Sequence, residues 1–491
     1  MKDCKQLKHK AVTGAFWTSI QRFMSIFIQF ISNIVLARLL TPNDYGCIGM
    51  LAIFMLLSST IIDGGFGSAL IQKKRPTQED YSTIFFWNLG LSIVIYVLLY
   101  LSAPFVAQFY HIELLCPVLR VQGIALIINA FQLIQTNQLN KQFKFKKISI
   151  VTLFSSVVSL MVTIVMAYKG FGVWSLVAQN LLMSSIPTVI YWLTNKWKPL
   201  LVFSIQSFKE LFSFGFYMFL STLLSTFVNN IQGLLIGRFY DAAQMGFYSK
   251  AHNTEKLAST SISQILSQVS YPLYAELQDD KNSLIKTIKK LTLSVSYLTF
   301  PMMLLLILLA KPIFILLFSD KWLPAVPFFQ ILCIAGLAIC LQSVNSQSIA
   351  AIGKSKVMFI WSFIKQGIGL LFMIVGLFFW GMKGLLIGMV MKSWLIYIIN
   401  ASLVSYYIGY KLWRQLLDIV PVLLLSTVAF AISYIGGGLI QISLYVDACI
   451  MFLVFVTVYV TSSVFFKMEA YILFYNLVNP HIRRIKDKLI K

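Results

Sequence analysis

The chain has 491 residues, of which 58% are hydrophobic and only 12% are charged. About a quarter of the residues in a soluble domain are charged, so this composition excludes a soluble globular protein and indicates an integral membrane protein. The net charge of +23 does not indicate nucleic-acid binding, because lysine and arginine gather in the cytoplasmic loops of membrane proteins and the sequence contains no soluble module rich in basic and aromatic residues.

The N-terminus is basic and leads into an apolar run that extends from about Gly14 to Leu36. This run is long enough to cross a bilayer and has no small-residue cleavage pattern, so we interpret it as an uncleaved first span and not as a signal peptide. The six cysteines and four histidines are scattered without metal-ligand spacing. We therefore expect no metal site and no cofactor.

We expect fourteen membrane spans, because each span needs about 20 mostly apolar residues. Basic residues in the N-terminal segment, in every second loop and in the C-terminal tail place both termini in the cytoplasm, since cytoplasmic loops carry the excess of positive charge. The expected spans cover residues 14–37, 45–71, 83–108, 117–139, 148–168, 172–194, 210–237, 244–271, 291–318, 325–350, 357–380, 384–408, 416–438 and 443–466.

The sequence repeats itself. Residues 36–46 (LARLLTPNDYG) align with residues 236–246 (IGRFYDAAQMG), and residues 117–146 align with residues 327–356. Each repeat holds six spans, which is an even number, so both copies have the same orientation in the membrane. We expect an all-α membrane protein with two parallel six-helix lobes, two extra spans and a basic cytoplasmic tail, at residues 1–195, 196–410, 411–466 and 467–491.

The eighth expected span, which contains residues 247–271, is unusually polar. Its polar residues recur every three or four positions and so share one helical face, which should face protein or a water-filled cavity. The first and seventh spans carry similar stripes, and together they predict a hydrated cavity. The stripe residues are Ser249, His252, Lys256, Ser259, Ser263, Ser267 and Ser270 in the eighth span, Thr18, Arg22, Ser25, Gln29 and Asn33 in the first, and Thr222, Ser225, Asn229 and Gly233 in the seventh.

Most charged residues at the depth of this cavity are cations. Arg22 and Lys256 lie well inside their spans, and Lys365 and Lys392 lie within the eleventh and twelfth spans. A positively charged cavity of low dielectric attracts an anion, and a phosphate or pyrophosphate is the expected group.

Asp63 and Glu255 are the carboxylates at membrane depth, and each is a candidate for coupling to an ion. The glycines after Asp63 fit a broken helix capped by that residue equally well. Alternatively, Asp63 pairs with Arg22 and Glu255 with a neighbouring lysine, and these pairs serve helix packing alone. His252 either titrates with pH or is a hydrogen-bonded structural histidine. Lys250 lies near the outer end of its span and is expected to snorkel to the surface.

Several motifs resemble a known family. Residues 36–46, 63–72 (DGGFGSALIQ) and 78–83 (QEDYST) resemble the polysaccharide-export branch of the MOP flippase superfamily, which is the Wzx-like and teichuronic-acid-exporter group. Residues 246–250 (GFYSK) and 272–280 (PLYAELQDD) extend the resemblance, which covers about residues 10–410.

The resemblance implies two lobes that form a V around a cationic cavity and work by alternating access. The implied substrate is an undecaprenyl-diphosphate-linked oligosaccharide, moved across the bacterial cytoplasmic membrane from its inner to its outer leaflet. Membrane lipids, H⁺ or Na⁺, and glycan polymerase or assembly proteins are the other expected partners. The expected residues for the diphosphate and sugars are Arg22, Lys256, Lys365, Lys392, Gln29, Asn33, Asn229, His252 and Ser259.

Two other functions are compatible with this architecture. A multidrug or cation antiporter of the same superfamily would favour a carboxylate-rich cavity, whereas this one is rich in cations. An integral-membrane glycan polymerase or glycosyltransferase would need a large outer loop, and the expected outer loops are short. The sequence has no nucleotide-binding glycine loop and no HExxH motif, so we expect no catalytic residues and no enzyme.

Overall fold

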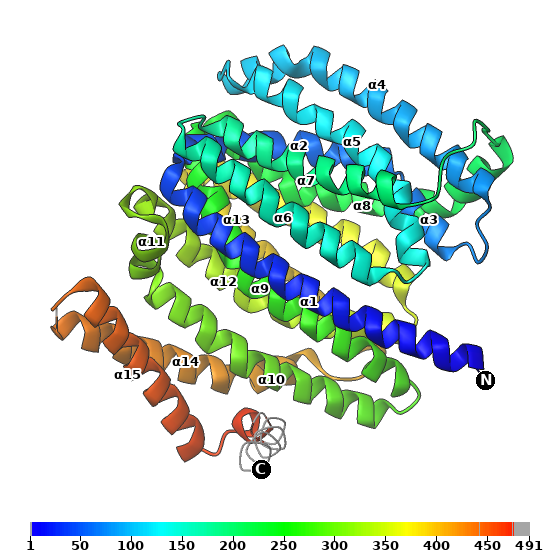
Figure 1. Cartoon of the computed structure of the whole chain (residues 1–491). Coiled ribbons are helices and arrows are strands. Elements are labelled where there is room, and N and C mark those ends of the chain that lie inside the picture. Colours follow the sequence, from blue (N-terminus) through cyan, green and yellow to red (C-terminus); the bar gives the residue numbers. More distant parts are fainter. Residues whose placement is uncertain (1, 441, 474, 476–491) are drawn as a thin grey trace, which may run out of the picture. The chain divides into compact units, whose positions relative to one another are not determined.

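The computed structural model describes residues 2–440, 442–473 and 475, and these residues form helices and connecting segments without a β-strand (Figure 1). The first eight helices are α1 (Lys2–Leu39), α2 (Pro42–Asp63), α3 (Phe66–Gln72), α4 (Gln78–Tyr110), α5 (Leu115–Lys141), α6 (Phe145–Tyr168), α7 (Val173–Thr194) and α8 (Ile205–Phe239). The others are α9 (Ala242–Glu276), α10 (Lys281–Leu308), α11 (Ala310–Phe318), the 3₁₀ helix η1 (Asp320–Ala325), α12 (Val326–Ala351), α13 (Ser355–Tyr407), α14 (Leu412–Ile440) and α15 (Leu444–Phe465).

Twelve segments of the described chain are long and apolar enough to cross a membrane. One of them, Val357–Tyr407 in α13, is long enough for two crossings, and its backbone leaves the helical conformation at Trp380 and Gly381. This break lies at the junction of the expected spans 357–380 and 384–408. The serine-rich α9, with 35 residues, is not among the twelve. Two crossings in α13 bring the twelve segments to thirteen, so the fourteen spans expected from the sequence are approximately right, and the expected eighth span in α9 stays a prediction.

The packing of the helices divides the chain into two units, with the boundary between Ser249 and Lys250 inside α9. In the first unit, α1 packs along α6, α6 along α7, α4 and α7 along α5, and α2 along α8. In the second, α10 packs against α12 and α14, α12 against α13, and α14 against α15. The predicted lobe boundary between residues 195 and 196 follows the sequence repeat and not this packing, and it stays a prediction.

Two of the sequence motifs lie at the N-terminal ends of helices. Thr41 and Asp44 form a capping box at the N-terminus of α2: the Thr41 N–H donates to Asp44 Oδ2 at 2.8 Å, and the Asp44 N–H donates to Thr41 Oγ1 at 3.3 Å. Thr77 and Asp80 form the same arrangement at the start of α4, at 2.8 and 3.2 Å. Such boxes satisfy backbone N–H groups that the first helical turn leaves unpaired. These threonine and aspartate residues therefore serve the fold.

Two glycines let the first turns of α2 and α9 touch through their backbones. A Cβ atom added to Gly46 would lie 1.8 Å from the Ala242 carbonyl oxygen, and one added to Gly246 would lie 1.9 Å from the Pro42 carbonyl oxygen. Gly46 and Gly246 are the last residues of the aligned segments 36–46 and 236–246. The contact is therefore reciprocal between the repeats, and it requires both residues to lack a side chain.

We predict that Gly46→Ala and Gly246→Ala each lower the melting temperature of the purified protein in detergent by several degrees, because the added methyl groups separate the two helices. Gly90→Ala in α4 is the control, since a Cβ there meets no atom within 4 Å. This substitution should leave the melting temperature unchanged or raise it, as alanine is the better helix former. Equal melting temperatures for all three variants would contradict the close approach of α2 and α9.

Candidate functional site

The polar face of α1 carries an uncompensated cation. Arg22 is half-buried, and in the described part of the chain its guanidinium forms no hydrogen bond or ion pair. Further along α1, Gln29 and Asn33 line a pocket shared with α6 and α7. On α8, the exposed Asn229 accepts a hydrogen bond from Gln232 Nε2 on its backbone oxygen at 2.7 Å.

Asp63 lies at a break between α2 and α3. Gly64 and Gly65 both have positive φ, at 54° and 78°, a conformation that glycine adopts without strain. Asp63 Oδ1 lies beside the first turn of α3, 3.0 Å from the position of a Cβ on Gly67. A Cβ on Gly65 would lie 2.4 Å from the Gly215 carbonyl oxygen of α8. Asp63 forms no ion pair with Arg22 in the described residues, and its position at the break fits the broken-helix interpretation.

The polar residues of α9 lie on two faces. Glu255 and Ser259 are buried, with 2% and 1% of their surfaces exposed. Glu255 Oε1 lies 2.7 Å from the position of a Cβ on Gly336 of α12, so both residues point into the second unit. Lys256 is exposed and His252 is intermediate. The structure therefore does not bring Ser259 together with Lys256, although the sequence stripe joined them.

Lys250 differs from expectation, because its side chain does not snorkel to the surface. Only 2% of its surface is exposed. Its Nζ lies 4.0 Å from the ring centroid of Phe318 at the end of α11 and 5.4 Å from a ring centroid of Trp322 in η1. The electron-rich faces of aromatic rings attract a cation, and these two rings hold the ammonium group inside the second unit.

Lys365 and Lys392 both lie where the two arms of α13 pack together. Gly376 and Gly384 bring the arms into backbone contact, since a Cβ on Gly376 would lie 2.2 Å from the Gly384 carbonyl oxygen. In this hairpin Lys365 is 8% exposed, and its Nζ donates to Asn400 Oδ1 at 2.8 Å.

The side chain of Lys392 packs on Gly369, one turn after Lys365: a Cβ on Gly369 would lie 2.5 Å from Lys392 Cγ. The structure thus places both predicted cations of α13 on the facing sides of the two arms.

The ion pairs of the described residues lie elsewhere. Lys73 pairs with Asp80 at 3.1 Å and with Glu210 at 2.9 Å, near a basic loop. Burial lowers the pKa of Lys73, but the hydrogen bonds and charges of Glu210 and Asp80 outweigh that effect, so its pKa lies above the ordinary value. Within the described chain, Lys256 and Lys365 form no ion pair. A cation at membrane depth without a carboxylate partner favours the approach of an anion.

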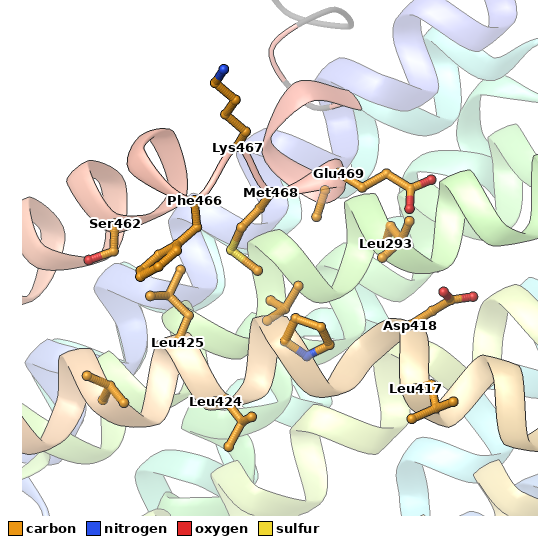
Figure 2. Close-up of a pocket in the computed structure, with 14 residues that line it drawn as sticks. Leu293, Leu417, Asp418, Leu424, Leu425, Ser462, Phe466, Lys467, Met468 and Glu469 are labelled. Carbon is orange, nitrogen blue, oxygen red and sulfur yellow. The ribbon is translucent and has the colours of Figure 1, made fainter.

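Figure 2 shows an apolar groove of about 650 Å³ among α10, α14 and the segment that follows α15. Leu425 and Phe466 belong to its apolar wall. Asp418 and Glu469 supply carboxylates to the lining, and Lys289 pairs with them at 3.5 and 2.9 Å. Lys467 also lines the groove, so its polar end carries charges of both signs and most of its remaining wall is apolar.

These features define a multi-pass helical membrane protein with cations inside its helical bundle. The chain belongs to the family of polysaccharide biosynthesis proteins, whose family model matches residues 35–327. It is 28% identical over 352 residues to the teichuronic acid biosynthesis protein TuaB of Bacillus subtilis. This alignment covers 71% of this chain and 73% of that protein. It is 23% identical over 407 residues to the lipopolysaccharide biosynthesis protein WzxC of Escherichia coli, with 82% of both chains covered.

Solved structures show the same fold. The lipid II flippase MurJ in an inward closed conformation superposes with a TM-score of 0.72 at 16% identity, over 93% of this chain and 99% of that one. An inward-facing multidrug resistance MATE family transporter of the MOP superfamily gives a TM-score of 0.59 at 17% identity, over 83% and 98% of the two chains. The chain therefore has the fold of these two structures, which is the fold that the motifs predicted.

We predict that Asn400→Leu destabilises the protein by about 1–3 kcal/mol, because it leaves the buried Lys365 ammonium without its hydrogen-bond acceptor. Asn400→Asp supplies a carboxylate at the same place and should raise the melting temperature in detergent. Lys256→Met is the control, since Lys256 is exposed and its substitution should not change the melting temperature. If the Asn400→Leu variant has the same melting temperature as the unmodified protein, the hydrogen bond between Lys365 and Asn400 does not stabilise the protein.

Proposed function

We propose that this protein is a flippase for an oligosaccharide linked to undecaprenyl diphosphate. It moves this lipid from the cytoplasmic to the outer leaflet of the bacterial cytoplasmic membrane, for the synthesis of a cell-surface polysaccharide. The observation that carries the proposal is the set of cations at membrane depth, Arg22, Lys256 and Lys365, which form no ion pair in the described residues. Membership of a polysaccharide biosynthesis family and the similarity to TuaB and WzxC support the choice of substrate.

The chemistry of a diphosphate matches these cations. A diphosphate carries several negative charges on clustered oxygens, and a charge-assisted hydrogen bond from lysine or arginine is about twice as strong as a neutral one. At low dielectric the attraction is stronger than in water. Arg22 in the first unit and Lys256 and Lys365 in the second each offer the diphosphate a cation, while the polyprenyl tail stays in the bilayer. Lys392, His252 and Asn229 add polar contacts as the headgroup passes.

The proposed mechanism is alternating access, in which the headgroup site opens first to the cytoplasm and then to the outside. Both termini lie in the cytoplasm, because the basic loops are retained on that side. Movement of the anionic headgroup is coupled to the membrane potential or to H⁺ or Na⁺. Of the two carboxylates, Glu255 is the better candidate for ion coupling, because it is buried and its Oε1 accepts no hydrogen bond in the described residues.

Deletion of the gene tests the proposal directly. We expect the lipid-linked glycan to accumulate in the inner leaflet, as measured by its protection from a membrane-impermeant glycosidase or lectin applied to spheroplasts. Normal delivery to the outer leaflet in the deletion strain, with no second transporter able to replace the protein, would refute the flippase function.

Complementation of the deletion tests the cations. Arg22→Ala and Lys256→Ala should each weaken binding of the diphosphate by about 10- to 100-fold, because a hydrogen bond to a charged group contributes about 1.5–3 kcal/mol. Neither variant should restore export at normal protein levels. Lys383→Ala, which removes an exposed lysine at the start of the second arm of α13, is the matched control and should restore it. Full restoration by both the Arg22 and the Lys256 variant would exclude a role for these residues in binding the diphosphate.

A further inference from the structure

The first unit contains a polar pocket that carries no charge. It has a volume of about 410 Å³ and is lined by residues of α1, α6 and α7, together with Tyr45 of α2. This volume lies within the range of about 300–1,000 Å³ that is common for small-molecule sites. None of its lining residues is charged, which separates it chemically from the cations on α1, α9 and α13.

Two amide side chains of the lining offer unused hydrogen-bonding groups. Gln29 of α1 and Asn180 of α7 line the pocket, and in the described part of the chain neither side chain forms a hydrogen bond. Gln29 lies 13 positions after Phe16, where the apolar segment of α1 begins, so it is about 20 Å along the helix at 1.5 Å per residue. Polar groups at this depth need a partner, because lipid supplies none.

Other polar groups of the pocket are held in fixed orientations. Gln179 Nε2 donates to Ser32 Oγ at 3.1 Å, which joins α7 to α1. Ser156 donates its hydroxyl hydrogen to the Thr152 carbonyl oxygen at 2.8 Å, so the Ser156 oxygen remains an acceptor. The pocket therefore offers amide donors, amide acceptors and hydroxyl acceptors side by side.

The apolar part of the lining completes the match to one class of ligand. Leu36, Leu160, Leu176 and Met183 lie among the polar residues, together with the ring of Tyr45. A sugar ring has hydroxyl groups that both donate and accept at its rim and apolar C–H groups on its faces. A divalent cation or a cationic drug would instead require carboxylate ligands.

We propose that this pocket binds an uncharged pyranose residue of the transported glycan, through Gln29 and Asn180. This inference rests on the proposed flippase function and adds to it a separate sugar subsite. The diphosphate binds to cations, whereas the sugar is recognised by neutral amides and hydroxyls on α1, α6 and α7.

Saturation-transfer NMR on the full-length protein in lipid nanodiscs tests the proposal. The probes are glucose, galactose, N-acetylglucosamine and N-acetylgalactosamine. We expect at least one of them to give a signal that falls by more than about threefold in Gln29→Leu and in Asn180→Leu, since each variant loses a hydrogen-bonding amide. Gln72→Leu, an exposed amide at the end of α3, is the control and should keep the signal.

Three results would overturn the sugar subsite. The first is that none of the four sugars gives a signal. The second is that the signal persists in both pocket variants at unchanged melting temperatures. The third is that no sugar binds and sodium chloride raises the melting temperature more than choline chloride does, with this difference lost in both variants, because the pocket would then be an ion site. These outcomes are independent of the leaflet assay, which alone decides whether the protein is a flippase.

Discussion

The structure depends on close contact between helix backbones at glycine. Lipid removes the hydrophobic driving force that holds helices together in water, so helices in a membrane associate through tight packing and interhelical hydrogen bonds. Gly46 and Gly246 let α2 and α9 meet at backbone carbonyls, and Gly376 and Gly384 do the same for the arms of α13. The second contact brings Lys365 within hydrogen-bonding distance of Asn400. The placement of the Lys365 ammonium group thus follows from the packing of small residues elsewhere in the same helix.

The charges are distributed unevenly between the basic loops and the membrane interior. Lys73 and Lys289 each contact two carboxylates, and pairs at such positions are partly hydrated. Within the described spans, Arg22, Lys256 and Lys365 have no such partner. Lys365 is buried and donates to Asn400, Arg22 is half-buried and Lys256 is exposed. A cation at membrane depth without a carboxylate partner favours the approach of an anion, so these three positions favour a role in binding one.

The sequence predicted the spans well, because long apolar runs and basic loops are properties of continuous segments. It also located the break in α13 between two expected spans. It could not assign faces within α9, since helical periodicity groups Ser259 with Lys256 whereas packing against α12 separates them. The burial of Lys250 was missed because its partners, Phe318 and Trp322, lie some 70 positions away. The pocket beside Gln29 needed Asn180 from α7, and a pattern within one helix cannot show that pairing.

Charge and hydrogen bonding would contribute differently to substrate choice in such a transporter. Every lipid-linked glycan on undecaprenyl diphosphate presents the same diphosphate, so cations attract all of them and discriminate among none. Discrimination between sugars requires fixed neutral donors and acceptors, because a site built to hydrogen-bond one hydroxyl rejects a ligand that leaves its polar groups unpaired. In the first unit those groups lie on α1, α6 and α7, and Gln179 and Ser32 hold two of the helices in register. Since α1 carries both Arg22 and Gln29, one helix would link the capture of the diphosphate to the recognition of the sugar.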